Sequence, residues 1–117
     1  MYVLKTSERS EFDLTKTHYF KASYDQIKEV YLEYLKNNGY KIVSINDDYF
    51  EIYAEKPHME VISKIIMQNP KETSIDFHIN SEFLFGNKGK AIKVLSDILK
   101  YIENKYELKG LSLHISD

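Results

Sequence analysis

The sequence predicts an α+β fold, a two-layer sandwich in which two helices pack on one face of an antiparallel sheet of four to six strands. Two segments carry apolar residues at helical spacing, and the four segments between them alternate apolar and polar residues as strands do. Short polar turns join these four segments, so neighbouring strands should pair antiparallel. The expected order is β-α-β-β-β-β-α.

A chain of 117 residues fits a single domain spanning 1–117, with one hydrophobic core. The absence of cysteine excludes disulfides and thiolate chemistry. The first residues contain no basic leader followed by an apolar run, and no apolar run approaches the roughly 18 residues of a membrane helix. We therefore expect a soluble cytoplasmic protein with no membrane partner.

The N-terminal segment carries the weakest pattern. Residues 1–10 could be frayed or could form a short edge strand. The sequence from 11 to 20 favours a strand, because Phe12 and Leu14 alternate with polar residues and are followed by Thr, Tyr and Phe, which favour strands.

The first helix is expected from Ser23 to Asn38. Ser23 and Gln26 have the spacing of a capping box, and Gly39 supplies the left-handed residue that ends a helix. Leu32 falls outside the apolar arc, so we expect it to be half exposed. The arc itself consists of Ile27, Tyr31, Tyr34 and Leu35, flanked by Tyr24 and Val30.

Four strands are expected next, and each is bounded by polar or proline-containing residues. In the last of them Ile75, Phe77 and Ile79 alternate with polar residues, which indicates one buried face and one open face. The expected ranges are 40–46, 49–55, 59–67 and 73–83.

The second helix is expected over 87–106. Its apolar residues sweep about 180° of the circumference, which is wider than contact with a sheet alone requires. The helix should therefore also contact the first helix, the C-terminal tail or another subunit. After Gly110, Leu111, Leu113 and Ile115 alternate with polar residues, which suggests an extra strand within 110–117.

The stretch 16–105 resembles small uncharacterised bacterial domains of β-α-β-β-β-β-α order and, at the level of fold class, TATA-binding-protein-like domains. The segment that carries the resemblance reads K-A-S-Y-D-Q-I-K-E-V-Y-L-E-Y-L-K-N-N-G-Y-K-I-V. It shows a cap of small residues, an amphipathic helix and the opening of the next strand. The resemblance implies a fold and brings no functional residues with it.

A polar row on the last strand is the first candidate site. If Ile75, Phe77 and Ile79 point inward, one open face carries Asp76, His78, Asn80 and Glu82. Alternate strand residues lie about 7 Å apart, so a metal would need further ligands from Glu51, Glu55 or Glu60. The four histidines form no known ligand cluster. We interpret the row as the solvated face of a sheet and expect neither a metal nor a cofactor.

The loop Gly86, Asn87, Lys88, Gly89 and Lys90 is the second candidate. Two glycines and two lysines at a helix start could hold an anion through free N–H groups. The loop matches neither a Walker motif nor the helix-to-helix context of a KH clamp. The favoured interpretation is a turn that needs glycine, with Asn87 as the N-cap.

The tyrosines Tyr24, Tyr31, Tyr34, Tyr40 and Tyr49 should mostly pack in the core and at its rim.

Tyr53 differs from these tyrosines, because its parity sends it to the open face of the sheet. Ile62, Lys64 and Ile66 should join it there, beside His78. Apolar side chains on an open face suggest an interface.

These patterns lead to three functional hypotheses. The leading one is a non-enzymatic module that binds a protein partner, itself included, through the open sheet face or edge. The alternative is a small-ligand or anion binder that uses the 86–90 loop. Nucleic-acid binding is disfavoured, because the net charge is −2 and Arg9 is the only arginine. No catalytic residues are identified, since the chain contains neither a G-x-S-x-G motif nor a cysteine.

Overall fold

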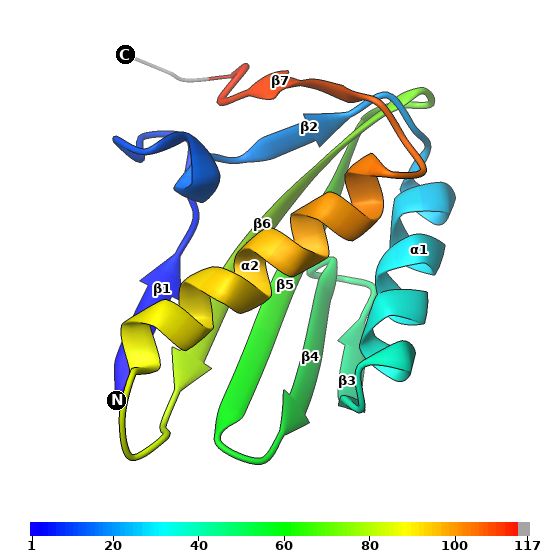
Figure 1. Cartoon of the computed structure of the whole chain (residues 1–117). Coiled ribbons are helices and arrows are strands. Elements are labelled where there is room, and N and C mark those ends of the chain that lie inside the picture. The colour runs from blue at the N-terminus through cyan, green and yellow to red at the C-terminus, as the bar shows by residue number, and fades with distance from the viewer. Residues whose placement is uncertain (115–117) are drawn as a thin grey trace.

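The computed structural model describes residues 1–114 and confirms the α+β class, with two helices on one antiparallel sheet (Figure 1). A single turn of 3-10 helix, Asp13–Thr15, interrupts the N-terminal segment. The helices are α1 (Tyr24–Asn37) and α2 (Asn87–Glu103). The strands are β1 (Tyr2–Lys5), β2 (His18–Phe20), β3 (Lys41–Asn46), β4 (Glu51–Lys56), β5 (Met59–Asn69), β6 (Glu72–Ser81) and β7 (Leu108–Leu111).

Within residues 1–114 the sheet has seven strands, and β6 lies at its centre. The strand order is β3-β4-β5-β6-β2-β7, and every pair is antiparallel. One edge of β6 pairs with β5, while its other edge pairs with β2 near the start and with β1 near the end. The sheet therefore includes β1, which the sequence left open as a frayed segment or an edge strand, and β7, the extra C-terminal strand, so it exceeds the four to six strands expected.

Both helices cover the same face of this sheet (Figure 1). The side chains of Ile75, Phe77 and Ile79 point into the resulting layer and are buried, as their alternation predicts. Ile52, Ala54, Val61 and Ile65 join them from β4 and β5, and α1 and α2 supply the opposing residues. In the described part of the chain, no α-helix covers the other face of the sheet.

The predicted capping box starts α1. The Ser23 hydroxyl oxygen accepts from the Gln26 backbone N–H at 3.2 Å, and the Gln26 side chain accepts from the Ser23 backbone N–H at 2.9 Å. At the other end, Gly39 adopts a φ of 77°, which glycine allows without steric cost. Leu32 is half-buried, as expected.

The wide apolar arc of α2 packs against the sheet and against α1 of the same chain. Ala91, Leu95 and Ile98 are fully buried against the sheet and the first helix. On the flank, the Tyr101 hydroxyl donates to Glu33 of α1 at 2.6 Å, and its ring lies edge-on to Tyr34. Because α1 covers the surplus arc, that arc gives no support to a subunit contact.

Several boundaries differ from the expectation. The strand expected over 11–20 is reduced to His18–Phe20. Leu14 lies within a 3-10 turn and Phe12 directly precedes it, so neither belongs to a strand. Strand β4 begins at Glu51, since residues 47–50 form the turn. Tyr49 lies in that turn and is 65% exposed, whereas Tyr31, Tyr34 and Tyr40 are buried as expected.

The C-terminal strand also lies earlier than predicted. It spans Leu108–Leu111 and pairs with β2, so it begins before Gly110. The predicted continuation through Leu113 is wrong, because residues 112–114 form a bend and a turn, and Ile115 lies outside the described residues. Within 1–114, neither helix has the length and apolar character needed to cross a membrane.

Candidate binding surface

The uncovered face of the sheet is the principal candidate surface. Cross-strand pairing aligns Tyr53 of β4, Ile62 of β5 and His78 of β6 in one row. The same row continues to Ser44 at the β3 edge and to Lys5 on β1. We call these five residues the central row. It crosses five strands and carries two half-buried apolar side chains between polar ends.

Two further predicted interface residues lie beside the central row. Lys64 is exposed and stands between Glu51 and Asp76 in the next row. Ile66 is half-buried opposite Ser74, one row further along β5. The structure thus places all five predicted interface residues on one face, with three of them in a single row.

The polar row of β6 does lie on this face, but its members have separate roles. Asp76 is a structural anchor, because its Oδ1 accepts from the Thr6 hydroxyl at 2.6 Å and the Thr17 hydroxyl at 2.8 Å. Thr6 in turn accepts from the Phe77 backbone N–H at 2.8 Å. These bonds fasten the segments after β1 and before β2 to the centre of the sheet.

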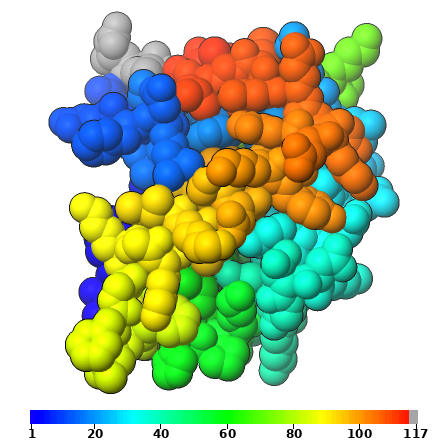
Figure 2. Space-filling view, viewed as in Figure 1, coloured from blue at the N-terminus to red at the C-terminus, as the bar shows by residue number. Residues whose placement is uncertain are grey.

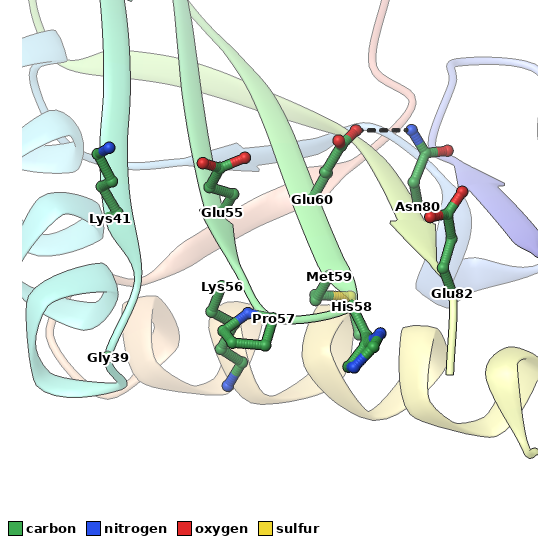
Figure 3. Close-up of a pocket in the computed structure, with 10 residues that line it drawn as sticks. All are labelled: Gly39, Lys41, Glu55, Lys56, Pro57, His58, Met59, Glu60, Asn80 and Glu82. Atoms are coloured by element: carbon green, nitrogen blue, oxygen red, sulfur yellow. Dashed lines mark hydrogen bonds between the residues drawn. The ribbon is translucent and has the colours of Figure 1, made fainter. Parts of the chain in front are cut away.

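An acidic hollow of about 480 Å³ adjoins the central row at the end of the sheet (Figure 3). Lys41, Glu55, Glu60 and Asn80 project from four neighbouring strands to the open side, whereas Lys56 and His58 point to the helix side. The Asn80 amide donates to Glu60 at 3.3 Å.

Tyr53 connects the central row to this hollow. The Glu60 carboxylate beside the Tyr53 hydroxyl raises the pKa of this hydroxyl above its usual value. Among residues 1–114, no group of three or more His, Asp and Glu side chains has an arrangement that could hold a metal ion.

The 86–90 loop is folded differently from the prediction. Gly86 is the N-cap, at a φ of 71°, and gives no side-chain cap. Asn87 is therefore not the N-cap. Its side-chain oxygen accepts from the Phe83 backbone N–H at 2.6 Å and the Ser81 hydroxyl at 3.0 Å, and its amide donates to the Phe83 carbonyl oxygen at 2.9 Å.

Lys88 and Lys90 flank the uncapped end of α2. The Lys90 ammonium lies 4.0 Å from the centre of the Phe83 ring, and the first turn contains no acidic residue. Lys88 lines a groove of about 570 Å³ together with Lys5, Phe12 and Ile92.

Sequence reasoning missed two exposed apolar features. Val43 and Ile45 are exposed on β3, the edge strand of the sheet. Leu84 and Phe85 are 86% and 76% exposed in the loop before α2. The F-L-F run resembles the end of a strand, and only its position directly before Gly86 could have indicated a turn.

No family model matches this chain, and no curated protein or solved structure matches it either. The resemblance to TATA-binding-protein-like domains therefore stays a prediction.

Proposed function

We propose that the protein is a small non-enzymatic binding module that takes a protein partner, itself included, on the open face of its sheet. The observation that carries the proposal is the central row, in which Tyr53 and Ile62 lie half-exposed on a face that no helix covers. An uncovered sheet face with apolar side chains is typical of an interaction surface.

The charges of this face favour protein over nucleic acid. Glu51, Glu55 and Glu60 stand among the lysines of the same strands, so the face offers no continuous positive surface for phosphates. At the β3 edge, Ile45 pairs with buried Ile52 and so faces the helix side, which leaves its exposed side chain outside the open face. A bulge between Ile42 and Ser44 interrupts the ladder there, which disfavours simple strand addition along the whole edge.

Two neighbouring residues on β5 allow a matched test of self-association. Ile66 faces the open side, while Met67 faces the helix side and is 56% exposed beyond the helices. We expect Ile62→Lys and Ile66→Lys to reduce association in sedimentation experiments, and Met67→Lys to leave it unchanged. If the wild-type protein stays monomeric up to high concentration, the proposal that it associates with itself is refuted.

A heterologous partner is tested by photo-crosslinking in cells. A photoreactive residue at position 62 should give defined adducts that the same residue at position 67 does not give. Identical adduct patterns from both positions would refute the use of the open face.

A second candidate function is the binding of a small anion at the 86–90 loop. It is favoured by the uncapped N-terminus of α2, whose first turn carries Lys88 and Lys90 and no acid. Titration with inorganic phosphate should shift the amide resonances of Lys88 and Gly89, and Lys88→Ala or Lys90→Ala should weaken the response. If phosphate moves none of these signals, this function is ruled out.

A further inference from the structure

We propose that Leu84 and Phe85 form a tip that docks onto the surface of an anionic lipid bilayer, with Lys88 and Lys90 contacting the headgroups. The proposal concerns peripheral contact only, and it departs from the expectation that the protein has no membrane partner. It is independent of the open sheet face.

The tip is held outward by the structure of its own loop. Asn87 bonds to both the backbone N–H and the carbonyl oxygen of Phe83, so residues 83 and 87 are clamped together. Gly86 turns the chain between them with its left-handed φ. Leu84 and Phe85 project from this turn, and both are more than three-quarters exposed.

Phe83 anchors the base of the tip. Its ring is half-buried, lies 5.4 Å from the His58 ring and receives the Lys90 ammonium on its face at 4.0 Å. One aromatic residue therefore packs inward while its two apolar neighbours project. In Figure 2 the yellow segment that precedes α2 stands out at the lower corner of the molecule.

The shape of this feature argues for a bilayer as the partner. A protein partner would have to offer a pocket for two adjacent bulky side chains on a convex loop, whereas a bilayer interface accepts them anywhere on its surface. Exposed Met1 lies at the same end of the sheet, because Tyr2 pairs with Ser81 just before the loop (Figure 1). It adds a third apolar side chain at that end.

The charge around the tip argues for anionic lipid. Lys88 and Lys90 follow the tip directly, and Lys5 lines the same groove as Lys88. The nearby carboxylates Glu60 and Glu82 point to the open side of the sheet, away from α2, which carries Lys88 and Lys90 (Figure 3). Each lysine near an anionic surface strengthens binding about fivefold.

The test uses the absence of tryptophan from the chain. Phe85→Trp provides a single fluorescent reporter in the tip, and Met67→Trp provides one on an exposed apolar position elsewhere. With vesicles of phosphatidylcholine and phosphatidylglycerol in equal parts, we expect a blue shift and quenching by brominated lipid from position 85 only. Vesicles of phosphatidylcholine alone should bind more weakly.

Vesicle co-sedimentation of further variants separates the contributions. Leu84→Ser with Phe85→Ser should weaken binding more than about tenfold, because it removes the apolar insertion. Lys88→Gln with Lys90→Gln should weaken it on the order of 25-fold, at about fivefold per lysine. The matched control, Lys93→Gln with Lys100→Gln on the same helix, should bind like the wild type.

Three results would overturn the proposal. The first is wild-type protein that does not bind anionic vesicles. The second is a Leu84→Ser/Phe85→Ser variant that binds them as well as the wild type. The third is a response to inorganic phosphate that accounts for all of the binding, which would indicate a free-anion site in place of a bilayer contact.

Discussion

Replacing Asp76 by alanine should destabilise the fold strongly, although this residue lies on the open face of the sheet. Its Oδ1 accepts two hydroxyl hydrogen bonds, one from Thr6 and one from Thr17. Both threonines are buried, Thr17 almost completely. Asp76→Ala therefore deletes two charge-assisted bonds and leaves two buried donors to find new partners.

The expected loss follows from these contacts. A hydrogen bond to a charged group contributes about 1.5–3 kcal/mol, and a buried hydroxyl left without a partner costs about 1–3 kcal/mol. Asp76 is only half-buried, so water can reach part of the vacated site and soften the loss. We expect Asp76→Ala to lower the free energy of unfolding by about 2–4 kcal/mol, a large share of the roughly 5–15 kcal/mol of a typical domain.

Urea unfolding followed by circular dichroism measures this change. Asp76→Asn is the matched control, because it keeps an acceptor oxygen and should cost about 1 kcal/mol, neutral bonds being roughly half as strong. Thr17→Val should cost about 1–2 kcal/mol, and its effect should shrink in the Asp76→Ala background. A change below about 0.5 kcal/mol for Asp76→Ala, the scale of an ordinary surface substitution, would contradict the anchor role.

Three further substitutions probe other parts of the structure. Lys109 forms an ion pair with buried Glu72 at 2.6 Å. Because the Lys109 side chain is 44% exposed, Lys109→Ala should lower the free energy of unfolding by about 1–2 kcal/mol in urea titrations, less than the loss of a fully buried pair. A change as small as that of Lys105→Ala would contradict this. Within residues 1–114 the buried Tyr40 hydroxyl has no hydrogen-bond partner, so Tyr40→Phe should leave the thermal midpoint unchanged or raise it, with a gain of up to about 1 kcal/mol. A clear loss would show that the hydroxyl is used. Burial lowers the pKa of His18 below its usual value of about 6.5, so the unfolded chain binds this proton more readily and stability should fall as pH drops below that value. His18→Gln should flatten this part of the stability curve relative to the wild type, and parallel curves for the two proteins would rule out His18 as a cause.

Local sequence patterns were sufficient to predict those elements whose structure depends on residues close together in the chain. The capping box of Ser23 and Gln26 starts α1 where predicted, because both bonds lie within one turn of the helix. The alternation of Ile75, Phe77 and Ile79 identified the buried face of β6, because side-chain direction in a strand follows from parity alone. Parity likewise placed Tyr53, Ile62 and His78 on the open face.

The sequence failed where distant segments decide local conformation. Phe12 and Leu14 alternate like strand residues, yet that segment turns because β1 and β2 must both reach the same edge of β6. Asn87 has the composition of an N-cap, but its side chain is taken by Phe83 and Ser81.

Taken alone, the sequence determined the fold class, the start of the first helix and the inward face of the sheet, since spacing along one chain specifies these features. Only the tertiary structure decided that α1 covers the broad apolar side of α2, that Asp76 is an anchor, and that Leu84 and Phe85 project outward. Each of these depends on contacts between residues that are distant in sequence or on a loop closed by a side chain, and periodicity contains no information about such contacts.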